Sequence, residues 1–554
     1  MIASERFLYD YGKGREWKRY FLRFALGFPN RYFVGMANLG FLWIYHLLNS
    51  VKGVRCDRFF LPEDYGGNVE TVELGRGIAE YDVVGFSVPF EVDYVNLVWQ
   101  LERSGVEPYS ARREGPLVVA GGVAVSANPE PIADFVDVVF VGEGDEAILE
   151  FVECWQALRY DNGRASSAMN KSRSMSTFKE ALMKNLKNIK GIYLPSLYSV
   201  FYFPDGRVRK IVPEAGAAQQ VKRRTVATLR WTAHSSVVTP NSVFRNMFLV
   251  ELSRGCPYNC RFCLTKFITC DFRTVREDEL KKVIDRGSGI SGRVGLIGTG
   301  FSSVSVLSDI CELILSKGGE VSFSSLRLTK QVREVFIRYG KRLGMNTITI
   351  APEVAVKRLH EIINKHPVEI EPETISELIE VGVKKIKMYF LIGVPGERDE
   401  DVEAIVDFAG QFRRGKDKIS VVLSVNPLVP KAFTPFQWCA MERREVLKDR
   451  IGILKRAVKK IGWITLKAES LRMAELQTVL SMGDRQLGKV ILMAARSGAA
   501  PSAFFRELKD NGLTLDFYAY RQRDIDEIMP WDLLEYPFGK QRLLEEYEKI
   551  RAAV

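Results

Sequence analysis

Histidine and cysteine are both scarce in this sequence. The chain has 554 residues with 4 His and 8 Cys, while 46% hydrophobic and 27% charged residues are ordinary for a folded protein. A disulfide-rich secreted scaffold needs far denser cysteine, so that class is excluded. The same balance excludes a disordered or collagen-like chain. No repeat of 20–50 residues is visible, which argues against a solenoid.

Long apolar runs are also missing. The opening residues, MIASERFLYDYGKGREWKRY, carry charges throughout and lack the apolar core of a signal peptide. The most apolar early stretch, residues 33–51, is interrupted by Asn38, His46 and Asn49, and we interpret it as a buried helix rather than a membrane span. We therefore expect a cytoplasmic protein with no membrane partner.

Positive charge is in modest excess. The 79 Lys and Arg against 68 Asp and Glu give a formal net charge of +11. On a chain of this length such an excess permits a polyanionic partner, for example RNA, but does not require one. Lys222, Arg223 and Arg224 form a compact basic group, which we interpret as a solvated loop.

The first third of the chain alternates apolar strands with helical patterns. Continuous apolar runs at residues 82–90, 116–122 and 137–141 predict buried strands of a doubly wound parallel sheet. Such sheets bind ligands beyond the carboxyl ends of their strands. The residues at those ends are Ser87, Gly121, Gly122 and Gly142. The alternative is that these glycines only form tight turns.

The middle and second half have a different rhythm. Residues 162–185 are small, polar and basic, as in an exposed linker, and Pro-Asp-Gly within residues 191–212 predicts a β-hairpin. Six strand–helix units follow and favour a parallel α/β barrel, incomplete in this chain. Their strands are expected at residues 247–253, 293–300, 321–328, 346–353, 384–397 and 419–430. Helices are expected after about residue 470.

Three of the eight cysteines crowd into one loop. SRGCPYNCRFCL places Cys256, Cys260 and Cys263 in C-x3-C-x2-C spacing directly after a predicted strand. Thiolates suit iron–sulfur clusters, copper(I) and zinc, but a structural zinc site needs four ligands, usually in two separated pairs. Because four thiolates saturate a cubane cluster, three leave one iron open for chemistry. The alternative is a zinc loop completed by Cys270.

The cysteine loop resembles the signature of radical S-adenosylmethionine (AdoMet, SAM) enzymes. This resemblance implies a [4Fe–4S] cluster on the three cysteines, AdoMet on the fourth iron, and reductive cleavage of AdoMet to a 5′-deoxyadenosyl radical. It also implies an electron donor such as ferredoxin or flavodoxin. By the same resemblance, the residues that contact AdoMet are Phe262, Gly298, Gly300, Ser325, Arg327, Glu353 and Gly393.

Longer segments resemble an uncharacterised branch of radical SAM proteins with an N-terminal cobalamin-binding-like domain. They include VGMANLGFLWIYHLLN, VVAGGVAVSANPEPIADF, VPKAFTPFQW, GDRQLGKVI and MPWDLLE. The resemblance implies an α/β fold in which a Rossmann-like cobalamin-binding-type domain precedes a partial TIM barrel of the radical SAM type. The expected divisions are 1–160 for the first domain, 161–242 for a linker with a β-hairpin, 243–470 for the barrel and 471–554 for a helical region.

The sequence departs from that branch at three places. It has no D-x-H-x-x-G motif, whose His ligates cobalt in many cobalamin domains, so binding without that ligand and loss of binding both stay open. Its four histidines are isolated along the sequence, and we interpret each as structural or surface. Val354, Ala355 and Val356 follow Glu353 where relatives have small residues resembling A-G-S. Phe433 stands near a position that is commonly His.

Three functions remain in competition. The leading hypothesis is a radical SAM enzyme acting on an unidentified substrate, specialised as a cobalamin-dependent methyltransferase if the first domain binds a corrinoid. The second is RNA modification, because VPKAFTPFQW also resembles radical methylthiotransferases. However, only Cys56 and Cys154 precede the cysteine loop, too few for their second cluster. The third is a non-catalytic iron–sulfur sensor, which would not need an open iron.

Overall fold

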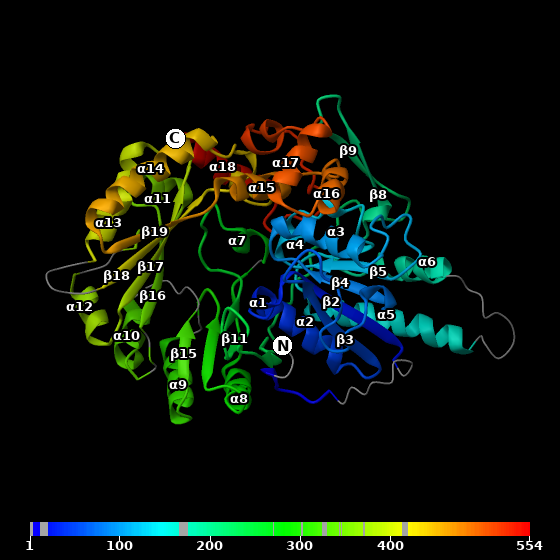
Figure 1. Cartoon of the computed structure of the whole chain (residues 1–554), viewed down its shortest axis with the longest axis horizontal. Coiled ribbons are helices and arrows are strands. Elements are labelled where there is room, and N and C mark those ends of the chain that lie inside the picture. Colours follow the sequence, from blue (N-terminus) through cyan, green and yellow to red (C-terminus); the bar gives the residue numbers. More distant parts are fainter. Residues whose placement is uncertain are drawn as a thin grey trace.

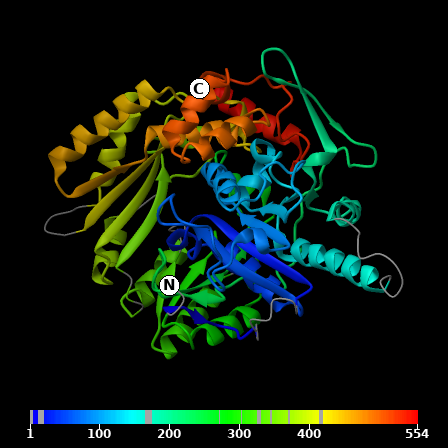
Figure 2. The same cartoon turned by 45° about the vertical axis from the view of Figure 1, so that its right-hand side comes forward.

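The computed structural model describes residues 4–11, 20–164, 175–269, 271–300, 303–323, 330–342, 344, 346–368, 372–412 and 419–554. Figure 1 shows two bodies of parallel sheet, one from the first third of the chain (blue) and one from the second half (green to yellow). The last helices, in orange and red, lie along the top of both (Figures 1 and 2). No helix among the described residues is long and apolar enough to cross a membrane.

Six strands form the N-terminal sheet, in the order β3-β2-β4-β5-β6-β7. The first five are parallel to their neighbours, and β7 pairs antiparallel with β6. The strands are β2 (Leu22–Arg31), β3 (Val54–Leu61), β4 (Val83–Ser87), β5 (Leu117–Gly121), β6 (Val138–Phe140) and β7 (Ile192–Tyr193). The predicted strands at 82–90, 116–122 and 137–141 are thus confirmed, whereas β2 and β3 were not predicted.

Helices cover both faces of this sheet. They are α1 (Tyr32–Gly35), α2 (Leu39–Ser50), α3 (Tyr94–Arg103), α4 (Val123–Ala127), α5 (Gly144–Arg164) and α6 (Met175–Leu186). The apolar stretch at 33–51 supplies α2, whose Phe41, Leu42 and Leu48 are fully buried, so the prediction of a buried helix is confirmed. The predicted hairpin is also present, as β8 (Tyr198–Tyr202) and β9 (Val208–Pro213).

Seven parallel strands from the second half form two separate sheets within the described residues. One has the order β11-β14-β15 and the other β16-β17-β18-β19. Their bounds are β11 (Met247–Glu251), β14 (Arg293–Ile297), β15 (Glu320–Phe323), β16 (Thr347–Glu353), β17 (Lys385–Ile392), β18 (Ser420–Pro427) and β19 (Ile464–Ala468). One hydrophobic core joins the sheets, with Val250, Ile350 and Leu423 all buried in it. The fold is therefore α/β, and β19 adds a seventh strand to the six predicted.

Helices alternate with these strands, as expected for parallel connections. They are α8 (Glu277–Gly287), α9 (Val304–Ser316), α10 (Lys330–Tyr339), α11 (Lys357–Ile363), α12 (Pro372–Glu380), α13 (Asp399–Gly410) and α14 (Arg444–Ile461). The chain then continues through α15 (Leu471–Ser481), α16 (Leu487–Arg496), α17 (Pro501–Asp510) and α18 (Lys540–Ala553), which agrees with the helical region predicted after residue 470.

The C-terminal segment around GDRQLGKVI contacts the N-terminal domain. The Asn128 side chain, in NPEPI, donates hydrogen bonds to the carbonyls of Ser481 and Gly483. Arg485, in GDRQLGKVI, pairs with the buried Glu130 at 2.7 Å. These segments therefore hold the C-terminal helices against the first sheet, and their sequence pattern reflects packing between distant parts of the chain.

Candidate functional site

The three clustered cysteines lie on one loop between two short paired strands. β12 (Ser253–Arg254) and β13 (Arg273–Thr274) pair antiparallel, and α7 (Leu264–Ile268) follows the last cysteine. The Cys263 amide donates to the Cys260 carbonyl at 3.1 Å, and all three thiols are half-buried. Burial raises the pKa of the Cys263 thiol; the Lys266 amide lowers it in part, and the neighbouring Cys256 raises it further. The loop therefore carries three reduced thiols.

The donor set of this loop fits an iron–sulfur cluster, since three soft sulfur ligands lie within eight residues of chain. Within the part of the chain that the structure describes, no three His, Cys, Asp or Glu side chains converge closely enough to hold a metal ion. The ligands are thus on one loop without being gathered in metal-binding geometry. Cys270, the alternative fourth ligand, lies outside the described residues.

Phe262 connects the cysteine loop to the ends of β16 and β17. Its ring packs against a small buried cluster that includes Val354, Val394 and Ile550. The Lys365 ammonium lies 5.9 Å from the centre of the Phe262 ring and pairs with the Glu353 carboxylate at 2.8 Å. The structure therefore brings Phe262 and Glu353 to one place, and it adds Lys365, to which sequence reasoning assigned no role.

Glu353 and Gly393 both occur at irregular strand ends. Glu353 has φ of +69°, where the pairing of β16 with β17 shifts register. Residues with side chains rarely adopt this conformation, and it is concentrated at functional sites. The Gly393 amide donates to the Glu397 carboxylate at 2.6 Å. Burial raises the pKa of Glu397 to about 7, although the Gly393 amide and Arg450 favour its charged form.

The glycine turn after β14 is fixed against the cysteine loop. The Ser253 hydroxyl donates to the Gly300 carbonyl at 2.8 Å, and the Thr299 hydroxyl donates to the Gly255 carbonyl at 2.7 Å. A Cβ on Gly298 would lie 2.6 Å from the Ser253 hydroxyl oxygen, so a larger residue would displace this contact. The predicted positions Ser325 and Arg327 lie outside the described residues.

A cavity of about 410 Å³ opens at the carboxyl edge of the N-terminal sheet. All four residues predicted at that edge line it, namely Ser87, Gly121, Gly122 and Gly142. Its walls are largely apolar and aromatic, and its far side is formed by Ile268, Thr269 and Ile297 from the second half of the chain. The cavity therefore lies between the two bodies, next to the cysteine loop. No histidine of the described residues lines it.

Two of the four edge residues are glycines for reasons of backbone packing. Gly122 has φ of +117°, and a Cβ there would lie 2.6 Å from the Val88 carbonyl oxygen. Gly142 has φ of +101° and packs directly on the backbone of Arg224. The turn interpretation thus accounts for this pair. Backbone packing does not require glycine at position 121, because a Cβ there would meet Phe140 at an ordinary 3.5 Å. The turn interpretation concerns glycines and does not apply to Ser87.

Arg254, two residues before Cys256, joins the two bodies beside this cavity. Its guanidinium pairs with Asp145 at 2.6 Å and with Glu251 at 2.8 Å. Burial opposes ionisation of Asp145, but attraction to Arg254 and hydrogen bonds from Arg254 and Trp43 outweigh it, so the pKa of Asp145 is lowered. Arg273 pairs in the same way with Glu143 at 2.5 Å. Sequence reasoning missed this network, because the pairs that join the two bodies, Arg254 with Asp145 and Arg273 with Glu143, are more than 100 residues apart.

One interpretation of charged residues was wrong. The basic group at 222–224 is not a solvated loop: Arg223 is 2% exposed, and Arg224 pairs with Glu146 and Glu150. Two histidines that are far apart in the sequence meet in the fold, in structural positions as interpreted. His46 and His234 lie with ring centres 5.5 Å apart, next to Trp43 of the cavity wall. Residues far apart in sequence form these groups, so no local pattern could reveal them.

Comparison with known families agrees with this arrangement. Residues 40–195 match the family described as "Radical SAM proteins, N-terminal", and residues 250–409 match "Radical SAM superfamily". The second match contains the cysteine loop and the strand ends that meet around Phe262. The chain therefore carries radical SAM domains and is an enzyme of the radical SAM class, for which a [4Fe–4S] cluster and AdoMet are implied.

Among individual proteins, an uncharacterised protein of Methanocaldococcus jannaschii is 26% identical over 513 residues, which are 90% of this chain and 96% of that protein. An uncharacterised methyltransferase of Pyrococcus horikoshii is 28% identical over 172 residues, covering 29% of this chain and 36% of that protein. The first similarity extends over the whole architecture, whereas the second is confined to one part of it.

Solved structures resemble the chain only weakly. Streptococcus suis SuiB bound to S-adenosylmethionine has a TM-score of 0.29 and 13% identity, over 41% of this chain and 50% of that one. HydG, a maturase of the [FeFe]-hydrogenase, has a TM-score of 0.29 and 14% identity, over 48% of this chain and 68% of that one. At these scores the likeness carries no argument about this protein.

Proposed function

We propose that this enzyme holds a [4Fe–4S] cluster on Cys256, Cys260 and Cys263 and cleaves AdoMet reductively to act on a substrate not yet identified. The observation that carries the proposal is the meeting of the cysteine loop with the ends of β16 and β17 around Phe262. When bound, the cluster supplies the electron that converts AdoMet to methionine and a 5′-deoxyadenosyl radical.

In this proposal, the chain's own residues bind and orient AdoMet. The Phe262 ring offers an apolar face for the adenine, and Glu353 is held in position by Lys365. The turn at Gly298 and Gly300 brings its backbone close to the loop, with only the small Ser253 side chain packed against it. Packing of the small cluster around Val354 and Val394 excludes water from this side of the site.

Methyl transfer through cobalamin is the specialisation that we propose for the first domain. The cavity at the carboxyl edge supports it, because the cavity has apolar walls, includes Ser87 and Gly121, and opens beside the cysteine loop. A corrinoid is far larger than 410 Å³, so only part of it would enter. No histidine of the described residues is in place to ligate cobalt there. The similarity to a methyltransferase of Pyrococcus horikoshii is in keeping with this chemistry.

The decisive measurement is release of 5′-deoxyadenosine per chain, on reduction of anaerobically purified protein reconstituted with iron and sulfide. Release supports the proposal. No release from protein with a full complement of iron would contradict it and would favour the non-catalytic sensor.

Cobalamin binding can be tested separately. Gly121→Leu places a branched side chain in the cavity, whereas Gly410→Leu makes the same change in open space at the end of α13. Wild-type protein and the Gly410 variant should retain hydroxocobalamin through gel filtration, and the Gly121 variant should lose it. Equal retention by all three proteins would show that the corrinoid does not use this cavity.

A further inference from the structure

Almost all of the net charge of the chain comes from one segment. Residues 161–242 contain 14 Lys and Arg but only 4 Asp and Glu, a net charge of +10, whereas the whole chain carries +11. The remaining residues, which include all of the second matched family region and residues 40–160 of the first, are close to neutral. A concentration of this kind produces a local positive field rather than a diffuse one.

Only some of these cations face solvent without a partner. Arg223, Arg224 and Lys179 are used inside the fold, and Lys222 lies near Glu535. By contrast, five cations on or after α6 and on β9 form no ion pair with any described carboxylate: Lys184, Lys187, Lys190, Arg209 and Lys210; Arg230, elsewhere in the segment, forms none either. Of the five, Lys187 approaches Gly216 just after β9. Lys187 thus brings the end of α6 next to the segment that follows β9, while Arg209 and Lys210, as successive residues of one strand, point to opposite faces of the hairpin.

Aromatic rings are interleaved with cations on this hairpin. Phe201 and Phe203 on and after β8 are 45% and 44% exposed. The Lys210 ammonium lies 4.7 Å from the centre of the Phe201 ring, and these two residues are cross-strand partners. The Arg207 guanidinium lies 5.8 Å from the Phe203 ring. The hairpin projects from the body in both views (Figures 1 and 2).

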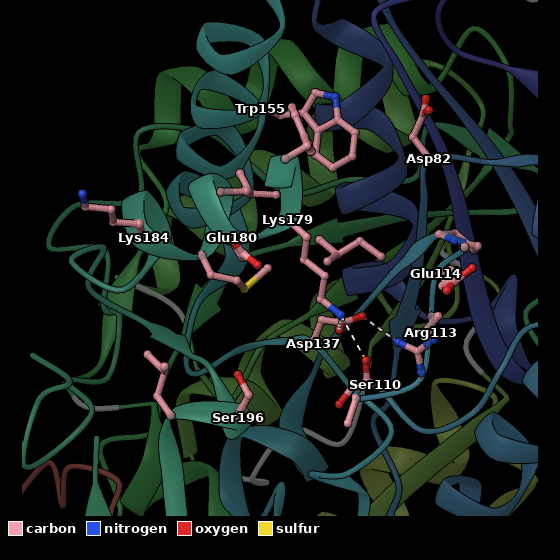
Figure 3. Close-up of a pocket in the computed structure, with 18 of the residues that line it drawn as sticks. Asp82, Ser110, Arg113, Glu114, Asp137, Trp155, Lys179, Glu180, Lys184 and Ser196 are labelled. Atoms are coloured by element: carbon pink, nitrogen blue, oxygen red, sulfur yellow. Dashed lines mark hydrogen bonds and ion pairs between the residues drawn. The ribbon is translucent and has the colours of Figure 1, made fainter. Parts of the chain in front are cut away.

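A hollow of about 830 Å³ adjoins the hairpin at the amino edge of the N-terminal sheet (Figure 3). Trp155, Phe178 and Leu197 supply apolar walls, and Lys184 and Lys187 also line it. Leu197 directly precedes β8, so the hollow and the hairpin are continuous.

Two deeply buried acids line the hollow, Asp82 and Asp137, and both are paired; Asp82 pairs with Arg23 at 2.5 Å. Figure 3 shows Lys179 reaching from α6 to Asp137 and to the Ser110 carbonyl. Asp137 is paired with Lys179 at 2.5 Å and with Arg113 at 2.6 Å, and these three groups leave one positive charge. The buried acids of the hollow are therefore compensated, and its apolar walls are bordered by Lys184 and Lys187 together with two exposed carboxylates, Glu114 and Glu180.

We propose that the surface formed by α6, the β8–β9 hairpin and this hollow binds single-stranded RNA. Cations would neutralise phosphates, Phe201 and Phe203 would stack on bases, and the hollow would accept a base turned out of the strand. Stacking on exposed aromatic side chains within a basic groove is the physical basis of single-strand binding. RNA recognition also favours unpaired bases that can be splayed into pockets.

An acidic protein is the competing partner, and it fits the surface less well. Such a partner would satisfy the lysines, but it would not use two exposed phenylalanines with cations stacked on them. An electron donor in particular must approach the cysteine loop. That loop leads into α7 near the centre of Figure 1, whereas α6 and the hairpin lie at the far right. The surface belongs to a partner that binds away from the iron–sulfur site.

Fluorescence anisotropy with a labelled 12-nucleotide RNA of mixed sequence tests this proposal on the full chain. Phe201→Ala with Phe203→Ala should weaken binding at least about tenfold, because base stacking is lost. Lys184→Glu with Lys187→Glu should weaken it further at low salt. That variant should also reduce the slope of log affinity against log salt by about one, since each phosphate contact contributes about 0.7 for a single strand.

Lys459→Glu with Lys460→Glu, two exposed lysines on α14, makes the same charge change elsewhere and should alter the affinity less than about twofold. The proposal is overturned if this control weakens binding as much as the α6 variant, or if the phenylalanine variant binds normally. Equal binding of poly-glutamate would point to an acidic protein, and equal binding of the matching DNA would show that RNA is not selected. All variants should keep their thermal unfolding midpoint and release of 5′-deoxyadenosine, so failure here leaves the proposed enzymatic function untouched.

Discussion

The two edges of the N-terminal sheet differ in how their charged residues are paired. At the carboxyl edge, next to the cysteine loop, Arg254 and Arg273 are paired with buried carboxylates around a cavity of about 410 Å³. At the amino edge, Lys184 and Lys187 border a hollow of about 830 Å³ without an ion-pair partner among the described residues. One sheet therefore separates an interior site with paired arginines from an outer edge that carries unpaired lysines beside its paired, buried acids.

This difference indicates what each edge can do. Paired, buried charges fix the positions of side chains and cancel each other's field, which suits a site that must hold a cofactor in one geometry. Unpaired surface cations retain their field and attract a polyanion in a manner that depends on salt. Substitutions that affect one edge and leave the other intact distinguish these two roles.

Loss of one cluster ligand should abolish chemistry at the carboxyl edge and leave the amino edge intact. Cys260→Ala removes one of three thiolates, so we expect a loss of bound iron and no detectable release of 5′-deoxyadenosine. Cys154→Ala, on α5, is the matched control and should keep both. Iron assays, product quantification and RNA anisotropy on the same preparations check the comparison. Unchanged iron in the Cys260 variant would contradict the assignment of the cluster.

Removal of Arg254 should destabilise the junction of the two bodies. Arg254→Gln leaves Asp145 and Glu251, whose side chains are 10% and 12% exposed, without their main cation. Leaving a buried charge unpaired costs about 3 kcal/mol, and a lower urea midpoint would report it. Arg293→Gln breaks an exposed pair with Glu320 and should cost less than about 1 kcal/mol. Similar midpoints for the two variants would show that the Arg254 network does not hold the bodies together.

Lowering the pH should destabilise the same junction, because two histidines resist protonation in the folded protein. Burial lowers the pKa of His46 and of His234 to about 4, and their mutual repulsion and Arg286 add to this at His46. The unfolded chain, with ordinary histidine pKa values near ~6.5, therefore binds more protons between about pH 4 and 6.5. Stability should fall as the pH is lowered through that window, by about 1–2 kcal/mol per histidine at pH 5.

Urea midpoints between pH 7 and pH 5 test this expectation. His46→Gln with His234→Gln should flatten the acid dependence, while the wild-type protein loses stability. An acid limb of the same steepness in this double variant would assign the effect to other groups.

The smallest effect is expected at Lys365. Lys365→Ala removes the partner of Glu353 and the cation near the Phe262 ring, without touching a cysteine. The affinity for AdoMet should fall about fivefold to tenfold, as expected for loss of a charge-assisted hydrogen bond. Equilibrium dialysis with labelled AdoMet measures this change, and iron content should stay the same. Lys357→Ala, an exposed neighbour on α11, serves as control; an equal loss there would deny Lys365 a specific role.

Much of the sheet architecture could be predicted, because buried parallel strands appear as apolar runs. β4, β5 and β6 are of this kind. β3 could not be predicted in this way, although all eight of its residues are buried, since VRCDRFFL places Arg55, Asp57 and Arg58 inside the protein. Arg55 pairs with Asp57 at 2.9 Å, and Arg58 pairs with Glu5 and Glu73. Only these tertiary partners allow charged residues in a buried strand.

The residues of the candidate site also differ in whether they could be predicted from the sequence. The ligand role of Cys256, Cys260 and Cys263 could be predicted from the sequence, because their spacing is local. The roles of Lys365 and Arg254 could not, because each acts through partners that the fold brings from another element. The cations of α6 were visible in part, because residues 162–185 read as basic and exposed, but their position beside the hollow and the segment after β9 depends on the fold.

The contact between Arg261 and α18 has a consequence for how the protein is made. Arg261, inside the cysteine loop, pairs with Glu546 at 2.8 Å, a residue 285 positions later in the chain. Because synthesis proceeds from the N-terminus, the loop leaves the ribosome long before its partner exists. During that interval Arg261 lacks its carboxylate partner on α18. This contact of the loop can therefore form only after Glu546 has been synthesised.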